Sequence, residues 1–91
     1  MVTPYGSRKL HEAALTVARD TPLADRLDAV RLVLAPVMES DLPADLRPTL
    51  RDLQAGLQKR VWDADEGQRL AGRVLELRDA VSRHEALARA R

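Results

Sequence analysis

Residues 70–81 read LAGRVLELRDAV, and the spacing of their apolar residues decides the fold class. The strongest apolar positions are spaced by four, three and four residues: Leu70, Val74, Leu77 and Val81. A helix of about 3.6 residues per turn brings all four to one face. A strand would need alternation with period two, which is sustained nowhere in the chain. The stretch therefore predicts an amphipathic α-helix.

The same spacing recurs in three earlier segments, with stripes that start at Leu10, Leu23 and Leu46. Helices are predicted over about 4–19, 22–35, 45–60 and 64–89. We expect an all-α protein, a small antiparallel bundle of about four helices that forms a single domain over 1–91. The C-terminal helix is the longest, at roughly 38 Å, and its end is expected to overhang the bundle.

Residues that favour helix starts agree with these bounds. Thr3 and Thr21 each precede a proline, so each offers a hydroxyl that caps free N–H groups in front of a residue suited to the first helical position. Asp63, followed three residues later by Glu66, forms an aspartate version of the capping box. These pairs predict the starts of the first, second and fourth helices.

Two breaks are predicted further along the chain. Pro36 ends the second helix because it has no N–H to donate and clashes with the preceding turn. The 13 steps from Leu57 to Leu70 rotate the apolar stripe by roughly 220°, so one straight helix would show core faces on opposite sides. A turn at residues 62–67, bending at Gly67, gives two antiparallel helices instead.

The composition allows only a thin core and no cysteine chemistry. There are 15 Leu, 8 Val and 14 Ala, but no Phe or Ile, and the absence of Cys excludes disulfides and thiolate metal sites. No apolar run of about 18 residues and no signal-peptide pattern occur, so we expect a cytoplasmic protein without membrane contact. The 13 Arg against 2 Lys are typical of a GC-rich bacterial genome.

No catalytic, cofactor or metal centre is predicted. The two histidines, His11 and His84, do not occur in a metal-binding spacing. Ser82 and His84 are two residues apart and point in nearly opposite directions on a helix, so they cannot pair as nucleophile and base. His84 lies on the apolar stripe, either as a pH-sensitive interface group or as a boundary histidine bonded to a carbonyl or water. We expect a non-enzymatic protein with no cofactor.

Charges on the last helix are spaced for intrahelical ion pairs: Asp65 with Arg69, Arg73 with Glu76, Asp79 with Arg83, and Glu85 with Arg89. These pairs would leave a few dispersed cations: Lys59, Arg60, Arg78 and Arg91. The net charge is only +1, and no basic stripe results. Nucleic acid is therefore not expected as the ligand.

Two leucines point away from the predicted core. Leu75 lies about 140° from the apolar stripe of the last helix, and Leu32 about 180° from that of the second. One explanation of Leu75 is that single exposed leucines are common on protein surfaces. One explanation of Leu32 is that the other helices surround the second helix on all sides. A homodimer, or a partner helix along the last helix, explains both. Trp62 either plugs the end of the core or anchors a partner.

These features predict a small protein-binding module: an adaptor, an inhibitor or immunity-type partner, or a subunit of a larger assembly, acting through a helix face. Its partner is another protein or a second copy of the chain. The predicted contact residues are Trp62, Leu75, Arg78, Ser82, Arg89 and Leu32. The alternatives are a helical DNA- or RNA-binding regulator, with the helix over 45–60 as the recognition helix, and an oligomeric enzyme with a shared site.

Overall fold

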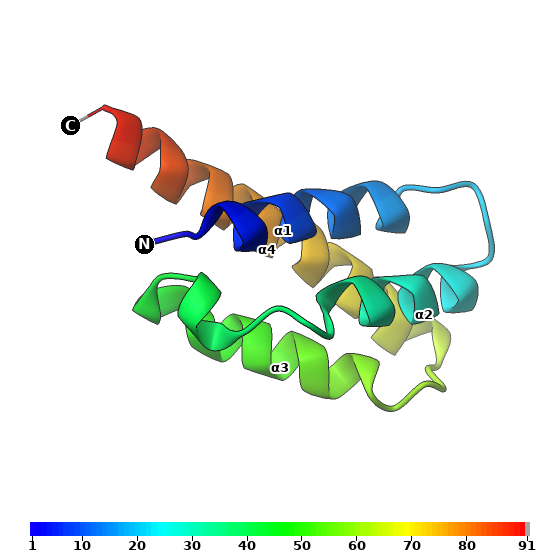
Figure 1. Cartoon of the computed structure of the whole chain (residues 1–91). Helices are drawn as coiled ribbons and strands as arrows, with labels where there is room; N and C mark the ends of the chain where they lie inside the picture. The colour runs from blue at the N-terminus through cyan, green and yellow to red at the C-terminus, as the bar shows by residue number, and fades with distance from the viewer. Residues whose placement is uncertain (91) are drawn as a thin grey trace.

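The computed structural model describes residues 1–90 and contains four α-helices in that range (Figure 1). Their bounds are α1 Pro4–Val17, α2 Leu23–Leu34, α3 Arg47–Leu57 and α4 Ala64–Arg89. Two single 3₁₀ turns, η1 Glu39–Asp41 and η2 Ala44–Leu46, connect α2 to α3. None of the described residues forms a strand, and α4 is the longest helix with 26 residues. The predicted all-α fold with its longest helix at the C-terminus is confirmed.

The helix α4 runs diagonally behind the other three (Figure 1). Helix α1 packs against both α2 and α4, and α3 packs against α2 and α4. The Ser7 hydroxyl at the start of α1 donates to Glu85 near the end of α4 at 2.9 Å, so these two helices are antiparallel. Each helix thus turns one face toward a shared centre.

The core consists almost wholly of leucine and valine. Its fully buried side chains come from all four helices and from the segment between α2 and α3: Leu10, Leu27, Val30, Leu34, Leu42, Leu50, Leu53, Leu57, Val74, Leu77 and Val81. Most residues that the 3.6-residue period assigns to the inner faces are buried, whereas Leu23 and Leu46 are only half-buried and Leu42 comes from the α2–α3 connection. Burial of each fully buried side chain contributes about 1.5–3 kcal/mol relative to an exposed position, before ordering entropy is counted.

Two of the three predicted helix starts are confirmed. The Thr3 side chain accepts from the Gly6 N–H at 2.9 Å and also donates to Asp41 at 2.8 Å, which ties α1 to η1. Asp63 accepts from the Glu66 N–H at 2.8 Å while the Glu66 side chain accepts from the Asp63 N–H, as a capping box requires. Both caps satisfy N–H groups that have no partner within the helix.

The second helix starts one residue later than predicted, and the predicted Thr21 cap does not form. Helix α2 begins at Leu23 with Pro22 as its N-cap in an extended conformation, and no side chain caps it. Arg26 instead binds the preceding segment, donating to the carbonyls of Thr21 and Val17 at 2.8 Å each. Arg26 thereby ties the end of α1 to the start of α2, but it binds carbonyl groups, so the first N–H groups of α2 have no side-chain cap.

The other helix ends differ from the predicted ones by a few residues. Helix α1 ends at Val17 rather than 19, and α2 ends at Leu34, directly before the break that Pro36 predicts. Helix α3 begins at Arg47, because η2 occupies the preceding residues, and ends at Leu57 rather than 60. Pro48 then falls in the first turn of α3, where its missing N–H costs nothing.

A turn separates α3 from α4, as predicted, but the chain does not bend at Gly67. The chain turns at Arg60, which adopts a left-handed conformation with φ 65°. Gly67 lies inside α4 and is buried, and a Cβ at that position would come within 2.9 Å of the Leu23 side chain. The glycine therefore permits close packing of α2 on α4.

The C-terminal end of α4 projects beyond the other helices (Figure 1). Residues 86–90 are all exposed, and the molecule extends 42 Å along its longest axis. The predicted overhang is confirmed. No helix among residues 1–90 combines the length and the apolar character needed to cross a bilayer.

Candidate interaction surface

The outer side of α4 carries a second row of residues at helical spacing. This outer stripe consists of positions spaced alternately by three and four residues: Gly72, Leu75, Asp79, Ser82, Ala86 and Arg89. It lies about 140° around the helix from the buried row that begins at Leu70. Leu75 is 40% exposed, and a Cβ on Gly72 would meet nothing within 4 Å. Nothing in the described chain covers this face.

Four of the six predicted contact residues lie together on this side of α4. Leu75, Ser82 and Arg89 belong to the outer stripe, and Arg78 borders it. The Nε atom of Arg78 is buried. It lies 3.2 Å from a carboxylate oxygen of Asp79 but makes no hydrogen bond. The Arg78 guanidinium therefore lies beside the outer stripe with its Nε–H donor unsatisfied.

The intrahelical ion pairs predicted on α4 do not form. None of the four pairs occurs among the salt bridges of residues 1–90. Exposed pairs of this kind contribute only a few tenths of a kcal/mol, too little to hold two long side chains in place. Two of the cations expected to be left over are paired instead, Lys59 with Glu66 and Arg78 with Asp79. The structure thus leaves Glu76 and Arg83 as exposed, unpaired neighbours of the outer stripe.

Trp62 lies away from this surface. Its indole Nε1 donates to the Gly56 carbonyl at 2.9 Å, and its ring is half-buried against the core. It lines a hollow with Leu23, Leu27 and Gly67 between α2 and the start of α4. These are the contacts of a residue that closes the end of the core, as one of the two predicted roles requires.

Leu32 also lies apart from the outer stripe, on α2. It is 62% exposed, so α2 is not wrapped on all sides, and that explanation of its all-round apolar run is wrong. The run is buried at Leu34 and half-buried at Val33, while Leu32 and Ala35 face solvent.

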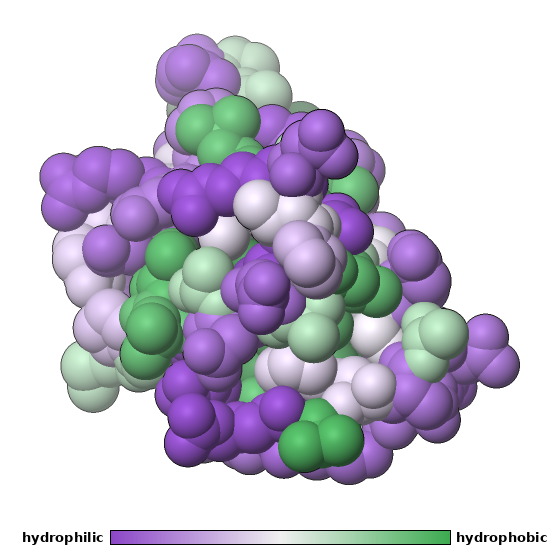
Figure 2. All heavy atoms as spheres, turned by 90° about the vertical axis from the view of Figure 1, so that its right-hand side faces the viewer, coloured by the Kyte–Doolittle hydropathy of each residue, from purple (hydrophilic) through white to green (hydrophobic). Residues whose placement is uncertain are grey.

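Several exposed apolar side chains escaped the sequence argument. They lie at the chain start, on α1, in two connections and at the end of α4: Met1, Leu15, Met38, Val61 and Leu87. Met1, Met38 and Val61 lie outside the helices, where the helical period predicts no direction, and Met1 and Leu87 line one hollow together with Val2. Figure 2 shows the side of the molecule at the α1–α2 and α3–α4 turns, where apolar patches are separated by polar side chains.

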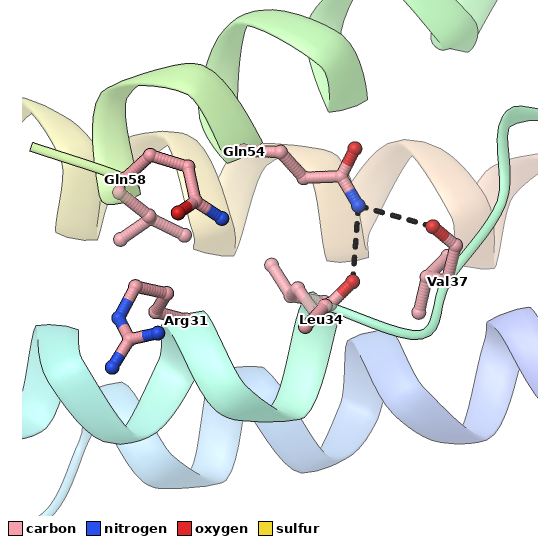
Figure 3. Close-up of a pocket in the computed structure, with 7 residues that line it drawn as sticks. Arg31, Leu34, Val37, Gln54 and Gln58 are labelled. Atoms are coloured by element: carbon pink, nitrogen blue, oxygen red, sulfur yellow. Dashed lines mark hydrogen bonds between the residues drawn. The ribbon is translucent and has the colours of Figure 1, made fainter.

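Two hollows on the surface could hold small groups. One of about 260 Å³ lies between α2 and α3, where the Gln54 side chain donates to the carbonyls of Leu34 and Val37 at 3.0 Å each (Figure 3). Arg31, at its other end, is paired with Asp28 at 2.9 Å. The second, of about 410 Å³, lies between the chain start and the overhang of α4, lined by Val2, His84 and Leu87 among others. In the first hollow, the Gln54 amide is already used in hydrogen bonds that connect α3 to α2 and to the segment after it.

No arrangement suited to covalent or metal chemistry appears in residues 1–90. His84 lies 3.1 Å from a carboxylate oxygen of Asp45, which replaces the backbone carbonyl or water expected for it, and His11 is exposed. Ser7 is bonded to Glu85, and Ser82 is exposed. No three His, Asp or Glu side chains in this range gather as metal ligands would.

No protein-family model, no curated protein and no solved structure matches the chain.

Proposed function

We propose that this protein is a small helical binding module that docks another protein along the outer stripe of α4. The observation that carries the proposal is the exposed Leu75 in a row at helical spacing, on a helix whose opposite face already supplies the core. Side chains that match the helical period and have no neighbour are typical of a helix that packs on a second surface.

The geometry of α4 supports this proposal. The helix extends beyond the bundle, and the residues at its end, 86–90, are all exposed. Gly72 and Ala86 let another backbone approach closely, while Leu75 supplies an apolar side chain between them. The core is thin, and binding to the native state would add to the stability of the fold by mass action.

The test compares two exposed leucines of the same helix. The wild type, Leu75→Asp and the control Leu87→Asp are used as baits in nuclease-treated lysate of the source organism, and circular dichroism checks that each is folded. We expect a stoichiometric protein that Leu75→Asp loses and Leu87→Asp retains. Equal capture by both variants would show that the outer stripe is not the contact surface.

A nucleic-acid ligand is the second candidate, because the intrahelical pairs expected to neutralise the arginines of α4 do not form. Arg69 and Arg73 are exposed beside a hollow at Gly56. However, Asp65, Glu66 and Glu76 lie on the same helix, so the local charge is mixed. Retention on heparin that falls with salt, together with a gel shift, would favour this candidate; no shift at low salt removes it.

A further inference from the structure

We infer that the partner on the outer stripe is a second copy of this chain, with the two α4 helices packed antiparallel about a two-fold axis between residues 80 and 81. This inference rests on the proposed function, since it names the occupant of the same surface. It is carried by the order of charges and side-chain sizes along α4. An isologous contact requires a surface that complements itself when reversed, and the outer stripe has this property.

The stripe has the spacing of the core positions of a coiled coil. In the antiparallel pair, a residue of one copy lies opposite a residue of the second copy when their two residue numbers add up to about 161. Large residues then meet small ones, and a hydroxyl meets a carboxylate: Leu75 faces Ala86, Arg89 faces Gly72, and Ser82 faces Asp79 of the second copy. By symmetry each of these contacts occurs twice.

The charges beside the stripe are complementary in the same alignment. Two pairs of opposite charge flank it across the two copies: Glu76 with Arg83, and Arg78 with Glu85. Glu76 and Arg83 are exposed and form no salt bridge within the described chain. Glu85 accepts from Ser7 through Oε1, which leaves Oε2 to receive a second donor.

Other alignments place like charges together. Moving one helix by seven residues in one direction sets Glu76 against Glu76 and Arg78 against Arg78; the opposite shift sets Arg83 against Arg83 and Glu85 against Glu85. A parallel pair sets Asp79 against Asp79 and Arg78 against Arg83. Like charges across an interface act against the wrong partner or register. The charge order of α4 therefore selects one direction and one register.

The contact is expected to be weak. It involves a few turns of one helix per copy, with a single leucine each, which falls among interfaces below about 1,200 Å². The two Asp79 carboxylates also lie near the axis, so their repulsion opposes pairing unless each is bonded to Ser82 of the other copy. We expect a reversible dimer with a dissociation constant in the micromolar to millimolar range.

Sedimentation velocity over low micromolar to about 1 mM protein tests the inference. The wild type should shift from monomer to dimer. Glu76→Arg and Arg83→Glu should each weaken dimerisation about tenfold, because each turns two attractive pairs into two repulsive ones. An equimolar mixture of these two variants should regain the dimer as a heterodimer. Leu87→Glu, an exposed position off the stripe, should leave the dissociation constant unchanged.

The register is tested by disulfide formation, which the cysteine-free background makes clean. Leu75→Cys mixed with Ala86→Cys should give a cross-linked heterodimer, because these positions face each other. Leu75→Cys alone should not, because two copies of that position lie 11 residues apart along the helix axis, about 16 Å. A disulfide requires Cα atoms within about 7 Å. Efficient cross-linking of Leu75→Cys with itself would overturn the antiparallel arrangement.

The inference and the proposed function can fail separately. A wild type that stays monomeric up to about 1 mM, or charge reversals that leave a dimer unaffected, would overturn the self-pairing. If Leu75→Asp nevertheless loses a captured protein that Leu87→Asp retains, the stripe binds a different partner and the proposed function stands. If the dimer forms through other residues and capture is insensitive to Leu75, both fail.

Discussion

The two faces of α4 follow the same helical period but differ in what covers them. The inner face places Leu70, Val74, Leu77 and Val81 against the other helices, and all four are buried. The outer stripe repeats the spacing with a glycine, a leucine, an alanine and polar residues, and it faces solvent. The same helical spacing thus occurs on both faces, but the inner face is apolar and covered by the other helices, whereas the outer stripe is mixed and uncovered in the described chain.

The largest difference between the two faces is expected when one leucine on each face is replaced by alanine. Leu77→Ala should lower the free energy of unfolding by about 2–5 kcal/mol, because it leaves a cavity at a side chain that is 1% exposed. Leu75→Ala should change it by less than about 1 kcal/mol in dilute solution. Urea denaturation measures both. A loss at Leu75 as large as that at Leu77 would mean that Leu75 is part of the core.

Two glycines of α4, one on each face, sharpen the comparison. Gly72→Ala should raise the free energy of unfolding by about 0.5–1 kcal/mol, because alanine favours the helix and its Cβ meets open space. Gly67→Ala should gain less or lose stability, because its Cβ would lie 2.9 Å from a methyl carbon of Leu23. Thermal unfolding of the two variants at low protein concentration measures the difference, and equal gains would contradict it.

The smallest effect is expected at a surface pair away from α4. The hydrogen bond from Arg51 to Glu39, at 2.6 Å, lowers the pKa of Glu39 from its ordinary value of 4.5 and outweighs desolvation. The folded state then holds the Glu39 proton less tightly than the unfolded state. The pair's contribution is complete above about pH 4.5 and is lost as the pH falls through the lower, folded pKa.

Glu39→Gln tests this pH dependence. The difference in unfolding midpoint between the variant and the wild type should be small above pH 4.5, diminish at lower pH and shrink further in high salt. A difference that grows as the pH falls would have the wrong sign for a carboxylate with a lowered pKa.

The sequence predicted the fold well where a single helix decides the outcome. The inner stripes, the Thr3 cap and the Asp63–Glu66 capping box depend on residues close in the chain, and they occur as expected except that Leu23 and Leu46 are only half-buried. Errors arose where two elements share a residue. Arg26 binds carbonyls of both helices at the α1–α2 connection, where the Thr21 cap does not form, and Gly67 packs against Leu23 inside α4 while the chain turns at Arg60.

The candidate surface was predictable in part for the same reason. The direction of Leu75 follows from helical geometry alone, and its exposure agrees with it. Side-chain partners were harder to predict, because several alternatives of similar energy compete on a surface. Lys59 reaches Glu66, and Asp45 reaches His84 across 39 residues, and neither pair follows from the spacing along one helix.

Site-specific photo-cross-linking in cells of the source organism tests most directly whether the outer stripe contacts protein. A photoreactive residue is placed at position 75 in one strain and at position 87 in another. The account predicts a protein cross-link at 75, of twice the chain mass if the partner is a second copy, and much less at 87. Equal yields at the two positions, or a cross-link at 87 alone, would contradict it.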